Sequence, residues 1–105
     1  METNGQAIGV LGDPTRRAIF ELLSERPSSV GDLAALVPVS RPAVSQHLKV
    51  MKDAGLLMDE RDGTRRIYRL DPDGVAEMRA YVDRFWNLAM AGFERRMEQR
   101  REETK

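Results

Sequence analysis

Apolar positions in the middle of the chain recur with the period of a helix. Val44, Leu48 and Met51 are spaced at i, i+4 and i+7, which predicts one buried helix face. Ser40 fits the N-cap of this helix, and Gly55 fits the position just past its last turn. The helix is expected over about residues 40–54, and its opposite face carries Arg41, Pro42, Ser45, Gln46 and Lys49.

After this helix the pattern changes to that of short strands. Segments 56–61 and 65–70 are strand candidates, and Asp62-Gly63 between them is a tight-turn signal. Arginines gather around the tip, at Arg61, Arg65 and Arg66. We therefore expect a hairpin with a cationic tip, called the wing, over residues 56–70.

Three shorter helices are expected before residue 40. The first 12 residues mix apolar side chains with glycines and predict a short, frayed helix. Asp13-Pro14 opens a firm helix whose core stripe is Ala18, Ile19, Leu22 and Leu23. Ser29 to Asp32 resembles a capping box and begins a helix of one to two turns through Leu33 and Leu36. A short helix, a tight turn and a longer helix are the order of a helix-turn-helix.

The final helix, expected over residues 72–100, is apolar around most of its circumference. One seam is formed by Val75, Met78, Val82, Phe85 and Ala89, and a second stripe by Trp86, Met90, Phe93 and Met97. Such a helix must be covered on two sides. One cover is the chain's own core, and we expect the other to be a symmetry mate in a two-fold dimer. In the alternative, both stripes serve the core of one monomer.

These patterns predict one mainly α domain over residues 1–105 with a small β-hairpin. The expected order is four helices, two strands and a final helix, which is a winged helix-turn-helix. A polar, cationic helix fits the major groove of double-stranded DNA, and arginines at a wing tip reach phosphates or the minor groove. The predicted function is therefore sequence-specific DNA binding.

Composition narrows the alternatives. The chain has 17 Lys+Arg and 17 Asp+Glu, so total charge does not indicate nucleic acid. The local distribution does, because residues 40–69 hold seven basic residues (41, 49, 52, 61, 65, 66 and 69) against four acidic ones (53, 59, 60 and 62). The absence of cysteine excludes disulfides and thiolate metal sites. No apolar run approaches the length of a membrane span, so we expect a cytoplasmic protein.

The chain resembles the ArsR-type family of bacterial transcriptional repressors. The resemblance is carried by Leu11-Gly-Asp-Pro-Thr-Arg-Arg-Ala-Ile19, by Ser45-Gln-His-Leu-Lys-Val-Met-Lys-Asp-Ala-Gly-Leu56 and by the wing from Arg61 to Leu70. It implies a homodimer, paired through the first and last helices, that binds an inverted repeat near a promoter. The family's metal sensors carry cysteines before the recognition helix or His/Asp pairs in the last helix. This chain has neither, so we expect no metal and no cofactor.

These arguments give two sets of candidate residues. The expected DNA contacts are Ser40, Arg41, Pro42, Ser45, Gln46, His47, Lys49, Arg61, Arg65 and Arg66. The expected dimer contacts are Ile8, Leu11, Val82, Phe85, Trp86, Ala89, Met90 and Phe93. For His47, the only histidine, a structural role is favoured over a metal or pH role, and Arg65 and Arg66 have the alternative of pairing with Asp59 and Glu60.

Three other functions compete with DNA binding. An enzyme is disfavoured because no nucleophile–base pair, phosphate loop or paired acids stand out. A winged helix that binds protein would tolerate loss of the cationic face. A ligand-responsive repressor would hold an apolar effector near Met78, Val82, Phe85 and Trp86.

Overall fold

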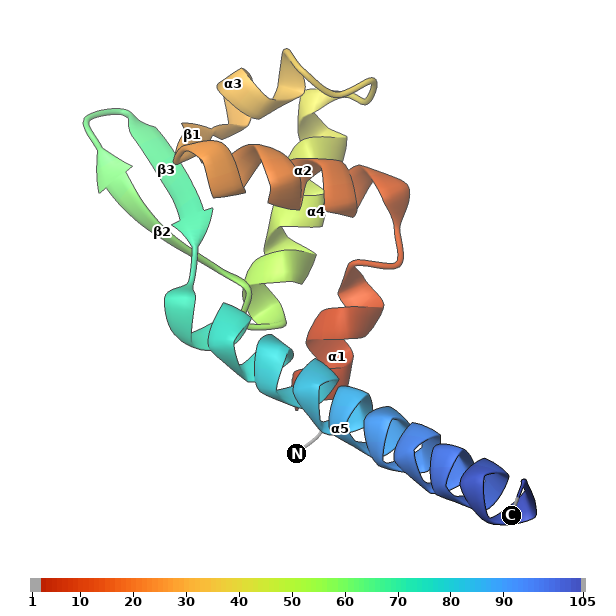
Figure 1. The fold of residues 1–105 in the computed structure, drawn as a ribbon. Coiled ribbons are helices and arrows are strands. Elements are labelled where there is room, and N and C mark those ends of the chain that lie inside the picture. The colour runs from red at the N-terminus through yellow and green to blue at the C-terminus, as the bar shows by residue number, and fades with distance from the viewer. Residues whose placement is uncertain (1–2, 105) are drawn as a thin grey trace.

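The computed structural model describes residues 3–104, which form five helices and three short strands (Figure 1). In chain order the elements are α1 (Thr3–Val10), α2 (Pro14–Glu25), β1 (Ser28–Ser29), α3 (Val30–Ala34), α4 (Arg41–Asp53), β2 (Leu57–Asp62), β3 (Arg65–Leu70) and α5 (Pro72–Glu103). The predicted order of helices and hairpin is confirmed, and strand β1 is an addition to it.

The three long helices α2, α4 and α5 begin where cap residues and prolines predicted. Asp13 Oδ1 accepts hydrogen bonds from the backbone N–H of Thr15 at 2.8 Å and of Arg16 at 3.1 Å. The Arg16 bond is the largest cause that lowers the pKa of the Asp13 carboxyl below its ordinary value. Ser40 Oγ caps α4 and Asp71 Oδ1 caps α5 in the same way. Each helix therefore has a defined start.

The core lies between α2, α3, α4 and the sheet. Ile19, Leu33, Val44, Leu48 and Met51 are completely buried. The predicted stripe on α4 is thus its inner face, and α2 lies across it in Figure 1. This packing leaves the other side of α4 free of the core.

The sheet has three antiparallel strands in the order β1-β3-β2. In the hairpin Leu57 pairs with Leu70 and Asp62 with Arg65, and Gly63 in the turn takes a φ of +67°. β1 was missed because its two serines carry no strand signal, and they gain strand structure by pairing with Tyr68 and Ile67.

Several predicted boundaries differ from the structure: β2 spans Leu57–Asp62 and not 56–61, and α5 extends to Glu103, beyond residue 100. Leu56 does not begin the hairpin, because its backbone N–H donates to Met51 O at 3.1 Å in the turn that follows α4. Gly55 beside it has a φ of +87°, as a helix-ending glycine should. Helix α3 ends at Ala34, so Leu36 lies outside it and is 67% exposed.

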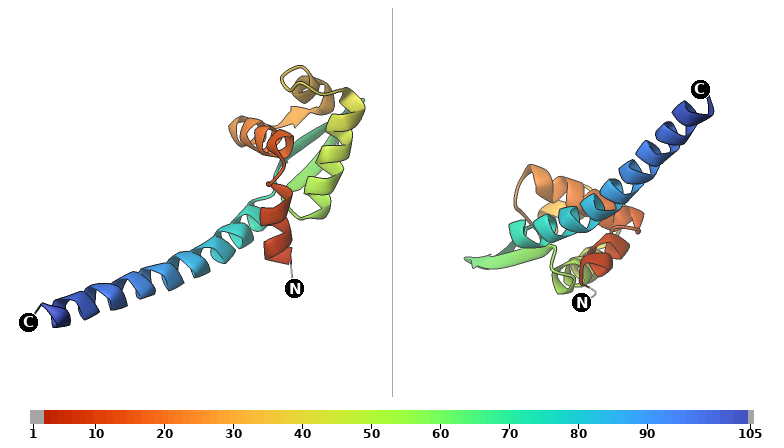
Figure 2. Two further views of the ribbon diagram at one scale, coloured as in Figure 1. Left: turned by 90° about the vertical axis from the view of Figure 1, so that its right-hand side faces the viewer. Right: turned by 60° about the horizontal axis from the view of Figure 1, so that its bottom comes forward.

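Helix α5 starts against the end of α4 and then leaves the body of the molecule (Figure 2). Asp71 N–H donates to Leu56 O at 2.8 Å. At Gly74 the two segments are so close that a Cβ would overlap the carbonyl of Gly55. Helix α1 lies beside α5, with Gly5 facing Tyr81.

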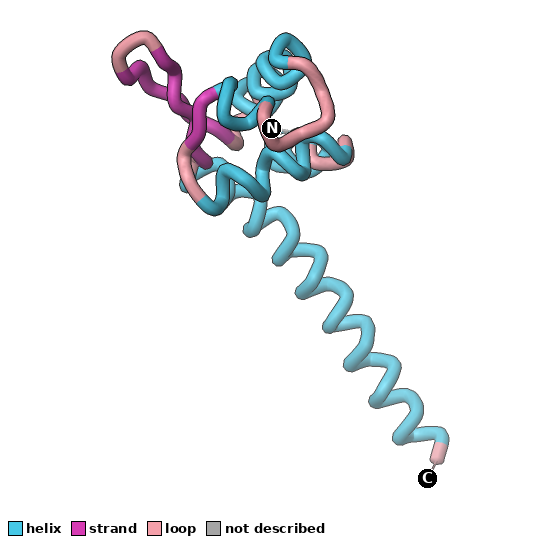
Figure 3. The backbone as a smooth tube through the Cα atoms, turned by 90° about the horizontal axis from the view of Figure 1, so that it is seen from above, coloured by secondary structure: helices cyan, strands magenta, loops and turns pink. Residues whose placement is uncertain are grey.

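The remainder of α5 projects as a single rod, opposite in direction to the wing (Figure 3). The molecule consequently measures 71 × 27 × 22 Å, and no residue of α5 is buried. None of the helices within residues 3–104 combines the length and the apolar character that crossing a membrane requires.

Candidate DNA interface

The outer face of α4 is the first part of the candidate interface. All the side chains predicted there are exposed: Ser40, Arg41, Pro42, Ser45, Gln46 and Lys49. Lys49 Nζ lies 3.2 Å from Asp53 Oδ2, one turn further along the same face. Both side chains are more than 60% exposed, and such pairs contribute little to stability. Lys49 therefore remains accessible to a partner.

A nearly buried carboxylate fixes the wing to the end of α4. Asp59 on β2 accepts from Lys52 Nζ at 2.7 Å and from Arg66 Nη1 at 2.8 Å, and its side chain is only 6% exposed. The hydrogen bond from Lys52 is the main cause that lowers the pKa of Asp59; burial raises it, and Arg66 lowers it further. The ion pairs hold the charged form, so Asp59 connects α4, β2 and β3.

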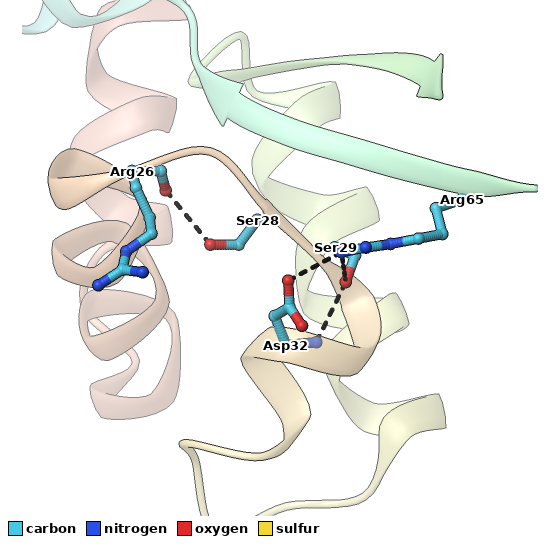
Figure 4. Close-up of polar contacts among 5 residues, drawn as sticks. All are labelled: Arg26, Ser28, Ser29, Asp32 and Arg65. Atoms are coloured by element: carbon cyan, nitrogen blue, oxygen red, sulfur yellow. Dashed lines mark hydrogen bonds and ion pairs between the residues drawn. The ribbon is translucent and has the colours of Figure 1, made fainter. Parts of the chain in front are cut away.

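Arg65 ties the wing tip to the start of α3, as Figure 4 shows. Its Nη2 donates to Ser29 Oγ at 3.1 Å and to Asp32 Oδ2 at 2.9 Å. Ser29 Oγ also accepts from Asp32 N–H at 3.1 Å and so caps α3, while the neighbouring Ser28 Oγ donates to Arg26 O. The expected capping box is therefore only half formed, because the Asp32 carboxylate turns to Arg65.

The wing arginines are thus divided between several partners. The alternative of pairing within the hairpin holds for Arg66 with Asp59, whereas Glu60 pairs with Arg69 at 3.0 Å and Arg65 goes to α3. The side chains of Arg65 and Arg66 nevertheless remain 56% and 48% exposed. About half of each side chain is still available to a partner.

These elements enclose a shallow surface hollow between the wing tip and the N-terminal ends of α3 and α4. It is lined by Arg41 of α4, by Thr64, Arg65 and Arg66 of the wing, and by residues 29–32. Arg41 Nη2 would lie 3.2 Å from a Cβ at Gly31, so this glycine leaves room for the guanidinium. Sequence reasoning missed the contribution of α3, because nothing local links residues 29–32 to the wing.

His47 is half-buried, and its ring contacts a side chain of α2. Arg16 Nη1 on α2 lies 3.3 Å from His47 Nδ1, and Arg16 Nε donates to Val10 O at 2.7 Å. The structural contact anticipated for His47 is therefore with an arginine that sequence reasoning did not single out.

The expected dimer residues fall into two groups. Ile8, Val82, Phe85, Trp86, Ala89, Met90 and Phe93 are exposed on α1 and α5. Leu11 is instead partly buried and packs on the chain's own core. Tyr81 and Phe85 stack edge to face with centroids 5.0 Å apart, and the guanidinium of Arg84 lies 5.3 Å from each ring centroid.

Among residues 3–104, no three His, Asp or Glu side chains gather into a group that could hold a metal ion.

Comparison with known proteins identifies this architecture. The family described as "Bacterial regulatory protein, arsR family" matches residues 13–58. The HTH-type transcriptional regulator Rv2034 of Mycobacterium tuberculosis is 58% identical over 83 residues, which are 79% of this chain and 78% of that protein.

Two solved structures are also similar. A crystal structure of a possible transcriptional regulator for arsenical resistance has a TM-score of 0.72 and 47% identity, and the match covers 77% of this chain and 84% of that one. The solution structure of the homodimeric winged helix-turn-helix DNA-binding domain of Mb0332 from Mycobacterium bovis has a TM-score of 0.67 and 26% identity, covering 82% and 80%. The winged fold and the exposed face of α4 agree with these matches. The chain belongs to the ArsR family of bacterial transcriptional regulators, which are not enzymes.

Proposed function

We propose that this chain is a repressor that binds an inverted-repeat DNA operator as a homodimer. The observation that carries the proposal is the exposed face of α4, which is polar and cationic and is flanked by the arginines of the wing. A protein with this target acts where the bacterial chromosome lies, so we place it in the cytoplasm.

Dimerisation is supported by the rod. Phe85, Trp86 and Phe93 are 49%, 61% and 55% exposed, which is a large apolar surface for a lone helix. A two-fold pairing of α5 with its copy, with Ile8 of α1 at the edge, would cover this surface. The homodimeric state of the similar Mycobacterium bovis domain agrees with this assembly.

On DNA, the dimer would place its two α4 helices in successive major grooves about 34 Å apart. Arg41 and Gln46 are suited to bidentate contacts with guanine and adenine edges. Ser40, Ser45, Lys49, Arg61, Arg65 and Arg66 are suited to phosphates. Pro42 is exposed in the first turn of α4, and His47 lies beside this set. Repression follows if the bound dimer blocks polymerase at a promoter.

Selection of duplexes from a random pool by the purified protein tests the proposal. We expect enrichment of a two-fold symmetric sequence, with an affinity that falls steeply as salt is raised. Arg41→Ala and Gln46→Ala should each lower affinity for the selected operator by about 5- to 150-fold while changing affinity for random DNA much less.

Matched controls are Arg79→Ala and Gln99→Ala on α5, where the same side chains are removed far from the α4 face. Equal losses on operator and random DNA would refute base contact by Arg41 and Gln46. Retention of no duplex at all, even at low salt, would refute DNA binding and favour a protein-binding winged helix.

A further inference from the structure

One guanidinium joins three helices at the centre of the molecule. Arg16 lies in the first turn of α2, next to the Asp13 cap. Its Nε donates to Val10 O at the end of α1, at 2.7 Å, and its Nη1 lies 3.3 Å from His47 Nδ1 in the middle of α4. The side chains of Arg16 and His47 are both half-buried.

The chemistry of the pair gives the contact a direction. An arginine side chain has only donors, so in this hydrogen bond Arg16 donates and His47 Nδ1 accepts. Two charged groups lie near the ring, the Arg16 guanidinium and the Asp13 carboxylate. Because the contact is partly shielded from water, it is stronger than the same bond at the surface.

Helix α1, held by this guanidinium, rests in turn on α5. Gly5 faces Tyr81 so closely that a Cβ at Gly5 would lie 3.4 Å from the phenolic oxygen. A continuous set of contacts therefore runs from α5 through α1 and Arg16 to the centre of α4.

The other end of α4 is attached to α5 directly. Asp71 N–H donates to Leu56 O, and Gly74 packs on the carbonyl of Gly55. With one attachment at His47 and another beyond Asp53, the direction of α4 relative to α5 is defined at two points.

We propose that Arg16 is a positioning residue that, through His47, sets the tilt of the recognition helix relative to the dimerisation helix. It thereby determines which spacing between two operator half-sites the dimer accepts. The proposal rests on the proposed function, because it requires a dimer that reads two half-sites. Arg16 is not among the proposed DNA contacts.

The test measures affinity by fluorescence anisotropy on three duplexes: the selected operator, the same operator with one base pair added between half-sites, and random DNA. Arg16→Gln is compared with Arg17→Gln, which removes the same charge from an exposed neighbouring position. His47→Leu removes the acceptor, whereas His47→Asn retains an oxygen near the place of Nδ1. Circular dichroism and light scattering report the fold and dimer of each variant.

We expect Arg16→Gln and His47→Leu each to lower affinity for the selected operator by about tenfold, a coupling of ordinary size for one bond. Preference for the selected spacing over the lengthened one should fall by a similar factor. Arg17→Gln should keep that preference, and His47→Asn should restore most of it. The double variant Arg16→Gln/His47→Leu should be no worse than either single one.

Spacing preference separates positioning from a general loss of stability, which would reduce all three affinities together. The proposal is overturned if Arg16→Gln keeps the spacing preference of Arg17→Gln, or if the two single losses add in the double variant. If Arg16→Gln does not fold, His47→Leu decides by the same criterion, since it leaves the Arg16–Val10 bond in place. Failure of the unaltered protein to bind any duplex overturns the proposed function as well, and this result is distinct from the others.

Discussion

The head of the molecule, residues 14–70, and the rod, residues 82–103 of α5, are ordered in different ways. In the head, the apolar stripe of α4 is matched by Ile19 and Leu33 from neighbouring helices and is fully buried. In the rod, an equally regular apolar pattern is not buried, and every large apolar side chain is at least 38% exposed. The apolar pattern therefore predicts a helix in both regions. Only in the head are the side chains that cover the apolar face supplied by the same chain.

The difference has an energetic consequence. Most helical stability in proteins comes from tertiary packing of an apolar face, and isolated helices are marginal in water. The head obtains this packing from its own chain. In the proposed dimer the rod obtains it from a second copy, so the stability of the rod should depend on protein concentration while that of the head should not.

The largest expected effect comes from emptying the core of the head. Leu48→Ala should lower the free energy of unfolding by about 2–5 kcal/mol, because a completely buried side chain is lost and a cavity remains. The matched variant is Leu88→Ala, which removes the same atoms from a side chain of the rod that is 64% exposed. Urea unfolding followed by circular dichroism should show a small change for Leu88→Ala, and equal losses would contradict the contrast between the two regions.

A charge on the rod should separate assembly from folding. Phe85→Glu should weaken dimerisation by about 2–4 kcal/mol, since a glutamate in an apolar interface must lose its hydration. Light scattering across a dilution series should show monomers, with the cooperative unfolding of the head retained. Arg79→Glu, at an exposed position of α5 nearer the head, serves as the control for added negative charge. A stable dimer of the Phe85 variant would refute pairing of the two copies through the rod.

Asp59→Asn tests whether the ion pairs of Asp59 stabilise the wing against α4. We expect the free energy of unfolding to fall by about 1–3 kcal/mol, because Lys52 and Arg66 would lose the charged partner that they share at a site shielded from water. Glu60→Gln is the control, since Glu60 is exposed and its pair with Arg69 should contribute less than about 1 kcal/mol.

The effect of Asp59 should depend on pH. Its pKa is lowered in the folded protein. The stabilisation is therefore complete above the unfolded value of about 3.9 and is lost as the pH falls through the lower folded value. Urea unfolding of the unaltered protein and the Asn variant should converge at acidic pH, and a difference that persists there would contradict the assignment.

The smallest expected effect concerns the outer face of α4. Asp53→Asn removes the partner of Lys49 and should change the free energy of unfolding by less than about 0.5 kcal/mol. It should raise affinity for any duplex by about two- to fivefold at low salt, because a negative charge leaves the proposed DNA surface. Anisotropy titrations at two salt concentrations measure the affinity for a duplex. Asp83→Asn on α5 is the control. Unchanged affinity at low salt would place this face away from DNA.

The parts of the fold that could be predicted depend on neighbours along the chain. Cap residues such as Asp13 and Ser40, followed by prolines, mark helix starts because the bonds that they make span only two or three residues. Gly63 marks the hairpin turn for a similar reason, since its positive φ is a local requirement.

The parts that could not be predicted depend on partners distant in sequence. Arg65 bonds to Asp32 across 33 positions and Arg16 meets His47 across 31, and neither pair has a local signal. β1 exists only because β3 lies beside it. Likewise the candidate DNA residues of α4 were found from one helix face, whereas the partners that hold the wing arginines became visible only in the structure.

The close contact of Gly74 with the Gly55 carbonyl is the point about which α5 would rotate relative to α4. From Gly74 to the end of α5 the helix is about 45 Å long, at about 1.5 Å per residue. A rotation of α5 by only about 10° at this contact would move its C-terminal end by about 8 Å, more than one helical turn. A single methyl group added at residue 74 would overlap the Gly55 carbonyl, and the resulting rotation would misalign the two rods of the proposed dimer along their entire length.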